Sequence, residues 1–349
     1  MKKKTTLSDI AKKLNVTPST VSRALDDHPR ISDSTKKAVL KIAHQFNYQP
    51  NNIASALRKG KSNIIGVIVP TSDRQFFASI IRGIEEIVRN EGYSLIICQS
   101  DEQTSKEKEK IDALLQIQVD GIIASVAKET TDYDHFKKIR NRGVPLVLYD
   151  RIGESLEANA VVINDYMGGY IAVEHLIQQG CKKIAHFAGQ QHIGIYQDRM
   201  RGYLEAMKAY NIPFNEEWVI ESDLIDDTQK ILELGKEMTQ QLLNLPERPD
   251  AIFSASDFAA LGAIQFLNEK KISIPDEIAL VGYSNDFASS IIEPGLTSID
   301  QYTKQMGNMA AKHFLNQINT KSGEQFTPEL TLLTPELVIR ASSLRNKHV

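Results

Sequence analysis

Apolar residues recur every three or four positions in three short stretches near the N-terminus, and this spacing predicts amphipathic helices. Thr6 is suited to cap the first helix, whose apolar face carries Leu7, Ile10, Ala11 and Leu14. Thr17 and Pro18 are suited to begin the second, because Thr caps free N–H groups and Pro is tolerated at the first helical position. Val21 and Leu25 share the buried face of this second helix. The side chains left to face outward are those of Pro18, Ser19, Ser22 and Arg23.

A third helix is predicted to begin near Ser32, with an inward face of Ala38, Val39, Ile42, Ala43 and Phe46. Only Asn15 and Val16 separate the first two helices, and Asn tolerates the left-handed backbone of a tight turn. Two short helices joined in this way form a helix-turn-helix, and the third closes a small apolar core. A further short helix, capped by Asn51, is expected in the basic linker that follows.

From residue 63 onward, continuous apolar segments alternate with stretches of helical periodicity. The predicted strands include NIIGVIVP, YSLIICQS, VDGIIAS and VPLVLYD, and later AVVIND, KKIAHFAG, DAIFSAS and EIALVGYSN. The predicted helices cover residues 77–90, 106–117, 135–140, 166–179, 197–210, 228–243 and 258–269. Apolar strands with helices between them indicate parallel sheets covered on both faces. The alternation of strands and helices begins again after Asp150. We therefore expect two doubly wound α/β halves with a ligand cleft at the carboxyl ends of their strands.

Charge is distributed unevenly between the helical N-terminus and the rest of the chain. Residues 1–61 contain 13 Lys and Arg residues against 4 Asp and no Glu, which is a net charge of +9. The whole chain has a net charge of −3, so the remaining residues carry −12. A basic helix-turn-helix fits duplex DNA, because phosphate contacts supply affinity and the second helix supplies base contacts. The same charge argues against the alternative that the three helices only cover the larger domain.

The composition of the 349-residue chain is typical of a globular protein with two or three domains. No apolar run is long enough to span a bilayer, and no apolar segment follows the basic N-terminus as in a signal peptide, so we expect a cytoplasmic protein. Cys98 and Cys181 are expected to be buried free thiols. The eight His residues show no spacing typical of a metal site, and no cofactor is expected.

Several longer segments carry a resemblance that extends over essentially the full chain. They include TLSDIAKKLNVTPSTVSRAL, NYQPNNIASALRKGKSNIIGVIVP, RGVPLVLYDR, DRMRGYLEAM, SDFAALGAIQFLNEKKISIPDEIALVGYSN and PGLTSIDQ. Together these segments resemble the lactose repressor (LacI/GalR) family of bacterial transcription regulators. The resemblance implies a DNA-binding headpiece over residues 1–49, a hinge helix and linker over 50–61, and a core over 62–349 that resembles periplasmic sugar-binding proteins. It implies discontinuous halves, an N-half of 62–163 plus 295–322 and a C-half of 164–294 plus 323–342.

The resemblance implies that the second helix of the headpiece lies in the major groove, with Ser19 and Arg23 at base edges. Phosphate contacts are implied for Thr6, Ser22 and Asn51. Leu57 is implied to insert into the minor groove at the centre of the operator, and the alternative is that it is an ordinary packing residue. The predicted DNA-binding residues are Thr6, Leu7, Pro18, Ser19, Ser22, Arg23, Asn51, Ala54 and Leu57.

The resemblance also implies a set of effector-binding positions in the cleft. They are Phe76, Phe77, Ser125, Asp150, Arg151, Arg199, Ser256, Ser284 and Gln301. One of the two Phe side chains is expected to stack on an apolar sugar face, and the other to belong to the core. Asp257 is expected to act as a helix N-terminal carboxylate rather than as a ligand contact.

Charge in the predicted cleft bears on the class of effector. The positive side chains of Arg74, Arg151 and Arg199 outnumber the carboxylate of Asp150, so a net-positive cleft favours an anionic or large sugar derivative. Two assignments stay open at this point, because Arg74 is equally compatible with a solvent-facing side chain, and His192 lies on a loop beside the predicted cleft.

These features predict a sequence-specific transcription regulator, in particular a repressor, whose operator affinity is controlled allosterically by a small sugar-like effector. A two-fold symmetric operator requires two headpieces, so we expect a homodimer. One alternative, an uptake binding protein, needs a signal peptide and has no use for a basic headpiece. The other, an enzyme, has no nucleophile elbow or phosphate loop to support it, although a glycosidase carboxylate pair is compatible with the sequence. Salt-dependent retention on heparin or operator DNA separates the first interpretation from the others.

Overall fold

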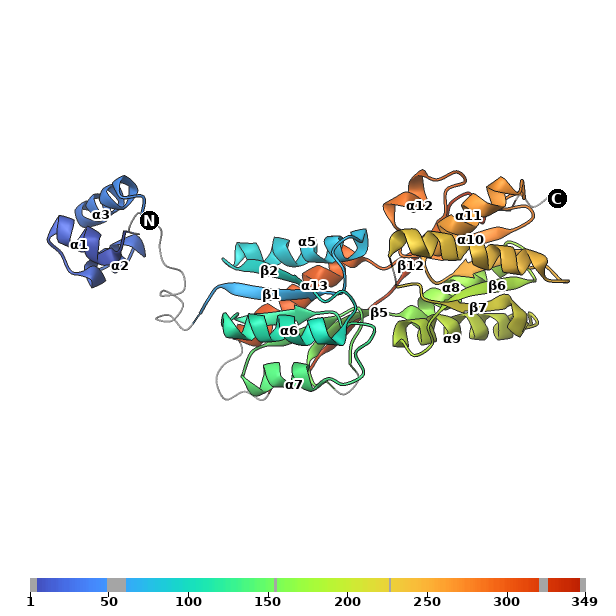
Figure 1. Ribbon diagram of the computed structural model, residues 1–349, viewed down its shortest axis with the longest axis horizontal. Helices are drawn as coiled ribbons and strands as arrows, with labels where there is room; N and C mark the ends of the chain where they lie inside the picture. Colours follow the sequence, from blue (N-terminus) through green and yellow to red (C-terminus); the bar gives the residue numbers. More distant parts are fainter. Residues whose placement is uncertain (1–4, 49–60, 154–155, 226, 320–325, 346–349) are drawn as a thin grey trace. The chain divides into compact units, whose positions relative to one another are not determined.

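The structure is a computed structural model that describes residues 5–48, 61–153, 156–225, 227–319 and 326–345 (Figure 1). It contains two compact units, Met1–Ser62 and Asn63–Val349. The predicted hinge helix lies outside the described residues, and with it the predicted DNA contacts of Asn51, Ala54 and Leu57. Among the described residues, no helix combines the length and the apolar character needed to cross a membrane.

The first unit consists of three helices, α1 (Leu7–Leu14), α2 (Pro18–Leu25) and α3 (Asp33–Gln45). The predicted caps are confirmed. Thr6 and Asp9 form a capping box at the start of α1, and the Thr17 hydroxyl accepts a hydrogen bond from the N–H of Thr20 at the start of α2. Asn15 has a φ of 53°, which is the left-handed conformation expected between α1 and α2. Local sequence therefore accounts for the tight turn.

The three helices enclose an apolar core of Ile10, Ala11, Val21, Ala24, Val39 and Ala43. Two predictions about exposure in this unit are wrong. Ser22 was expected to face outward but is only 8% exposed, because it borders the packed face of α2 and its side chain is small. Phe46 was expected to point inward but is 37% exposed, because α3 ends before it and the helical periodicity no longer applies.

The N-half of the core is built on one parallel sheet with the strand order β11-β5-β4-β3-β1-β2. Its strands are β1 (Ile64–Val69), β2 (Ser94–Gln99), β3 (Gly121–Ala124), β4 (Leu146–Tyr149), β5 (Asn159–Ile163) and β11 (Leu330–Leu333). Two helices cover one face, α5 (Gln75–Asn90) and α13 (Thr303–Asn319), and two cover the other, α6 (Thr104–Gln116) and α7 (Asp134–Asn141) (Figure 1). Alternate residues of β1 point to opposite faces, so Val67 packs under α5 and Ile68 under α6.

The C-half is built on a second sheet with the strand order β12-β10-β9-β8-β6-β7, in which only β12 runs antiparallel to its neighbour. Its strands are β6 (Ile184–Gly189), β7 (Val219–Ser222), β8 (Ala251–Ser254), β9 (Ala279–Tyr283), β10 (Thr297–Asp300) and β12 (Glu336–Val338). One face carries α8 (Asp165–Gln178) and α9 (Gly194–Ala209), and the other carries α10 (Thr228–Asn244) and α11 (Asp257–Glu269). A short helix, α12 (Phe287–Ile291), precedes β10. Two doubly wound halves were predicted, and the structure has this architecture.

The chain crosses between the halves after β5, after β10 and after β11. The predicted boundaries of the halves are wrong in two places. β10 pairs with β9 and so belongs to the C-half, and β11 pairs with β5 and so belongs to the N-half. Both strands are four residues long, and strand pairing over a long separation along the chain decides which sheet each one joins. The crossings place the ends of both sheets around one cleft.

Candidate functional site

The outward surface of α2 carries the side chains predicted to read bases. Pro18, Ser19 and Arg23 are exposed, as expected, and Arg23 lies in the last turn of the helix. The predicted phosphate contact Thr6 is also exposed, but its hydroxyl donates to the Asp9 carboxylate at 2.8 Å. Leu7 is half-buried against the core of the first unit. The exposed set forms a small polar and basic surface on a firmly packed helix.

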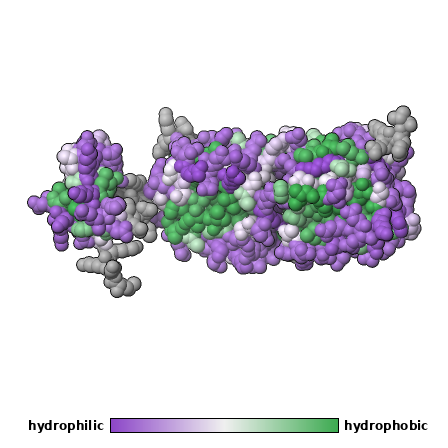
Figure 2. Space-filling model, turned by 90° about the horizontal axis from the view of Figure 1, so that it is seen from above, coloured by the Kyte–Doolittle hydropathy of each residue, from purple (hydrophilic) through white to green (hydrophobic). Residues whose placement is uncertain are grey.

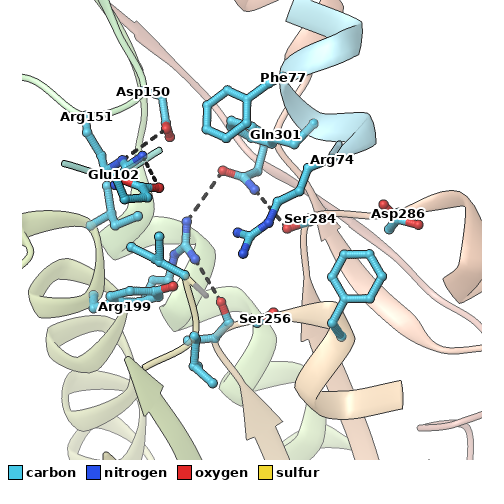
Figure 3. A pocket seen from close by; sticks show the side chains of 17 residues that line it. Arg74, Phe77, Glu102, Asp150, Arg151, Arg199, Ser256, Ser284, Asp286 and Gln301 are labelled. Atoms are coloured by element: carbon cyan, nitrogen blue, oxygen red, sulfur yellow. Dashed lines mark hydrogen bonds and ion pairs between the residues drawn. The ribbon is translucent and has the colours of Figure 1, made fainter. Parts of the chain in front are cut away.

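A pocket lies between the two halves of the core, at the carboxyl ends of their strands (Figure 3). The N-half supplies Arg74, Phe76, Phe77, Glu102, Asp150 and Arg151. The C-half and the crossing after β10 supply Ile195, Tyr196, Arg199, Leu224, Ile225, Ala255, Ser256, Phe258, Ser284, Asp286 and Gln301. The structure thus brings together every predicted effector residue except Ser125. Ser125 is fully buried behind the pocket, where its hydroxyl donates to the Asp150 carboxylate at 3.3 Å.

The sequence left open whether Arg74 and His192 belong to the cleft, and the structure shows which of them lines the pocket. Arg74 lines the pocket, and Figure 3 shows its side chain extending into it. His192 is exposed and lines a neighbouring groove on another side of Arg151. Phe76 and Phe77 both line the pocket and pack edge to face, with ring centroids 5.0 Å apart. Phe77 is only 4% exposed and belongs to the core of the N-half, so Phe76 offers the more accessible ring.

Arg151 is held by a carboxylate that the sequence analysis missed. Its two terminal nitrogens each donate to Glu102 at 2.9 Å, and both side chains are almost fully buried. Glu102 and the preceding Asp101 have left-handed φ values of 60° and 49° just after β2. Non-glycine residues in this conformation are strained, and here the strain directs the Glu102 carboxylate toward the pocket. The Arg151 charge is therefore compensated within the protein.

Arg199 is held in the same manner by the C-half. Its Nε donates to Asp165 at 2.7 Å and one terminal nitrogen donates to the Ala255 carbonyl at 2.8 Å, while the other lies 3.5 Å from the Gln301 side-chain oxygen. Its guanidinium also stacks 3.7 Å from the centroid of the Tyr283 ring. These contacts from four segments fix the orientation of Arg199 at the pocket wall.

Asp150 directly follows β4, lines the pocket and has a left-handed φ of 59°. Burial raises the pKa of its carboxyl to about 6, although the neighbouring Arg151 guanidinium acts in the opposite direction. Asp257 is buried as well, but it does not line the pocket. It accepts hydrogen bonds from the Asp286 backbone and the hydroxyls of Ser289 and Ser298, and it lies in the first turn of α11 as expected. Asp257 therefore supports the pocket wall.

The prediction of a net-positive cleft is wrong. The three arginines that line the pocket are accompanied by Glu102, Asp150 and Asp286, so the formal charges balance. Sequence reasoning overlooked Glu102 although it follows the second predicted strand, the position where carboxyl-end residues approach a cleft. It also overlooked Tyr196, Phe258 and the buried Asp165, since nothing in their local sequence marks them.

The pocket is narrow, with an open volume of about 70 Å³. Typical ligand pockets are several times larger, at about 300–1,000 Å³. The halves are also joined directly at the mouth of the cleft, because Lys128 of the N-half lies 2.6 Å from Asp223 of the C-half. The pocket as the structure shows it is therefore smaller than a typical small-molecule site, and an ion pair joins the two halves beside it. In the described part of the chain, no group of three or more His, Cys, Asp or Glu side chains is arranged to hold a metal ion.

Comparisons with known proteins cover both units. Residues 6–51 match the family described as bacterial regulatory proteins, lacI family, and residues 173–343 match the periplasmic binding protein-like domain. The chain is 33% identical over 337 residues to the HTH-type transcriptional repressor PurR of Actinobacillus pleuropneumoniae serotype 3, which covers 97% of this chain and 98% of that protein.

Two solved structures are similar as well. The lac repressor dimer bound to operator and the anti-inducer ONPF has a TM-score of 0.85 and 25% identity, covering 98% of this chain and all of that one. A LacI family transcriptional regulator from Enterococcus faecium with bound ribose has a TM-score of 0.69 and 27% identity, covering 81% of this chain and all of that one. The similarity therefore includes a structure on operator DNA and one with a small ligand.

Proposed function

Because the chain belongs to the lacI family of bacterial regulatory proteins, we propose that it is a transcriptional repressor whose operator affinity is set by a small polar effector in the core cleft. The observation that carries the proposal is that one chain combines an exposed polar and basic surface on α2 with a polar pocket between the two halves of the core. DNA binding belongs to the first unit and ligand binding to the second. Coupling between them requires that the effector bind two arrangements of the core with different affinity.

The proposed DNA contacts follow from what α2 exposes. Arg23 has the planar guanidinium that pairs with guanine in the major groove, and Ser19 lies about one turn nearer the start of the helix, next to Pro18 at its first position. Thr6 and Leu7 at the start of α1 are assigned to the DNA backbone. Ser22 is assigned a smaller role than the sequence suggested, since its burial leaves it little surface for a phosphate.

We propose a homodimer, because two headpieces are needed to bind two half-sites of a symmetric operator. Large apolar side chains are exposed in both halves of the core. Ile97 on the edge strand β2 is 49% exposed, and Phe287 and Ile291 on α12 are 63% and 69% exposed. Figure 2 shows apolar surface over each half on one face of the molecule. A second copy related by a two-fold axis is the partner that covers both areas at once.

The pocket composition favours a sugar-like effector. Aromatic and aliphatic side chains, including Phe76, Tyr196 and Phe258, provide apolar surface for the face of a ring. Asp150, Ser256 and Gln301 provide acceptors and donors for hydroxyl groups on its edge. Aromatic surface combined with a few convergent polar groups is typical of small-molecule sites.

The proposal is tested by selecting duplexes from a random pool with the purified chain, followed by titration of the selected site at several salt concentrations. We expect a two-fold symmetric sequence, an affinity that falls steeply with salt, and a dimer in sedimentation. A thermal-shift screen of sugars then identifies the effector, since a ligand at 100 times its Kd stabilises by about 2.7 kcal/mol. Failure to select any sequence, or binding that does not depend on salt, would favour the enzyme or uptake alternatives.

A further inference from the structure

We propose that Lys128 of the N-half and Asp223 of the C-half form a latch that holds the two halves of the core in the arrangement seen here. The Lys128 ammonium donates to the Asp223 carboxylate at 2.6 Å, across a separation of 95 residues along the chain. The pair lies beside the pocket rather than in its wall. This inference rests on the proposed function only where it concerns the operator, and the latch itself can be tested without DNA or ligand.

The latch is better shielded from water than a typical surface ion pair. The Lys128 and Asp223 side chains are 19% and 27% exposed. In the surface pair of Lys183 with Glu247, the side chains are 44% and 59% exposed. A partly buried ion pair is screened less by salt, and a short charge-assisted hydrogen bond is among the stronger contacts between side chains. The latch therefore has the strength to affect how the halves are held, which a fully exposed pair rarely has.

On the N-half, Lys128 lies on a loop that two buried carboxylates hold in place. Glu102 accepts a hydrogen bond from the Lys128 N–H at 2.9 Å, and Glu107 accepts one from the Ala127 N–H at 2.7 Å. Both Glu residues are buried. The same Glu102 carboxylate holds Arg151 at the pocket wall (Figure 3). The loop that carries the latch and the wall of the pocket therefore share one anchor.

On the C-half, Asp223 is oriented by its own turn. One of its carboxylate oxygens accepts a hydrogen bond from the Ile225 N–H at 3.1 Å, and the other accepts from Lys128. The two residues that follow Asp223, Leu224 and Ile225, are buried and line the pocket. Each end of the latch is thus attached directly to a wall of the pocket.

A second polar contact between the halves is expected to contribute less. The Gln75 side chain accepts a hydrogen bond from the Phe287 N–H at 3.1 Å. Both residues are exposed and neither is charged, so water competes effectively for this hydrogen bond. Movement of the halves apart would break both contacts, and we expect the ion pair to account for more of the energy required.

The latch acts on the balance between two arrangements of the core. A contact that forms in only one arrangement shifts the equilibrium toward that arrangement. Removal of the ion pair should therefore act in the opposite direction to a ligand that bridges the two walls of the pocket, by a factor set by the energy of the pair. Operator affinity follows if the headpieces respond to the same equilibrium, as the proposed function requires.

The first test is small-angle X-ray scattering from the full chain without DNA or ligand. It compares the unmodified protein with Lys128→Met, with Asp223→Asn, and with a double variant that reverses both charges, Lys128→Asp with Asp223→Lys. The control is Lys183→Met, which removes the same charge from an ion pair inside the C-half. We expect a larger radius of gyration in both single variants, and the original radius in the reversed pair and the control. Equal radii in all five proteins would overturn the latch.

Circular dichroism of the same samples separates rearrangement from unfolding. A radius that grows because the halves move apart leaves the helical signal unchanged, whereas a radius that grows through unfolding lowers it. The reversed pair decides the case in which both single variants unfold. A latch predicts that this variant regains the helical signal and the original radius, and failure to regain them would count against an electrostatic contact between the halves.

The second test measures affinity for the duplex that the unmodified chain selects from a random pool. We expect Lys128→Met and Asp223→Asn to change this affinity in the same direction by about 3- to 10-fold. The reversed pair and Lys183→Met should stay within about 2-fold of the unmodified protein. Because Lys183→Met changes the net charge as Lys128→Met does, it accounts for any general electrostatic effect on DNA binding. Tighter binding by the single variants would identify the arrangement seen here as the one that releases the operator, and weaker binding as the one that holds it.

The outcomes separate this inference from the proposed function. Equal radii with a tightly bound operator would overturn the latch and leave the repressor proposal intact. A larger radius in the single variants with unchanged operator affinity would support the latch and contradict control of the operator by the arrangement of the core. Failure to select any duplex would contradict the repressor proposal, and scattering would still decide whether Lys128 and Asp223 hold the halves together.

Discussion

The outward surface of α2 and the pocket of the core both present arginines, but the two regions hold them in opposite ways. Arg23 is exposed and is positioned by the helix on which it lies. Arg151 and Arg199 are 7% and 4% exposed, and their carboxylate partners lie 49 and 34 residues away along the chain. A substitution on α2 should therefore alter binding alone. A substitution in the pocket should alter binding and the free energy of unfolding together.

This difference bears on how Arg199 can be tested. The resemblance of the sequence implies that Arg199 is an effector contact. In the structure Arg199 also satisfies Asp165 and the Ala255 carbonyl, so its removal leaves a buried carboxylate without a partner. Arg74 is the better probe of ligand binding, because it is half-exposed and makes no cap.

The largest effect is expected for Glu102→Ala. Removing one partner of a buried ion pair leaves the other charge uncompensated, and we expect the free energy of unfolding to fall by about 3–5 kcal/mol. Urea unfolding measures the change. Glu157→Ala is the control, because Glu157 pairs with Arg140 at the surface and surface pairs contribute about 0–1 kcal/mol. Equal effects of the two substitutions would show that the Arg151 pair does not stabilise the core.

Arg23→Ala should weaken operator binding without changing the stability of the first unit. We expect a loss of about 1–3 kcal/mol at one operator position and a change in the free energy of unfolding within about 0.5 kcal/mol. Competition titrations with single-base variants of the operator give the first quantity. Lys41→Ala, an exposed charge on α3, should weaken operator and random DNA alike. If Arg23→Ala did the same, α2 would not be the helix that reads bases.

Asp150→Asn should stabilise the core at neutral pH. The folded pKa of about 6 lies above the usual value of 3.8 for an Asp carboxyl, so the native state binds a proton that the unfolded chain releases, and stability falls as the pH rises from about 4 to 6. Replacing the carboxyl with an amide removes this penalty, and we expect a gain of roughly 1–3 kcal/mol at pH 7.5. The gain should disappear near pH 4 in parallel urea titrations. A gain that does not depend on pH would mean that Asp150 is not the titrating group.

The smallest effect is expected for Thr6→Ala. Loss of the capping hydrogen bond to α1 should cost about 1 kcal/mol in the first unit. Ser8→Ala, at the exposed second position of the same helix, should change stability by less than about 0.5 kcal/mol. Hydrogen exchange of the α1 amides follows the change in this unit separately from the core. Equal protection in the two variants would argue against the capping box as a source of stability.

Features that depend on neighbouring residues could be predicted from the amino-acid sequence. The caps at Thr6 and Thr17, the start of the third helix near Ser32 and the left-handed Asn15 were predicted because helix starts and tight turns depend on residues within one turn. The order of strands and helices in the core followed from apolar periodicity in the same way. Exposure of Ser19 and Arg23 was predicted correctly as well, since one helix and its apolar stripe decide which face is outward.

Features that depend on residues far apart in the sequence became visible only in the folded chain. The joining of β10 to the C-half and β11 to the N-half depends on which sheet edge is nearest, and a four-residue strand carries too little pattern to show it. The pairing of Arg151 with Glu102 and of Arg199 with Asp165 likewise depends on side chains that meet only after both sheets have formed. Counting charges along the chain therefore suggested a positive cleft, whereas folding brought Glu102, Asp150 and Asp286 to the same pocket as the three arginines.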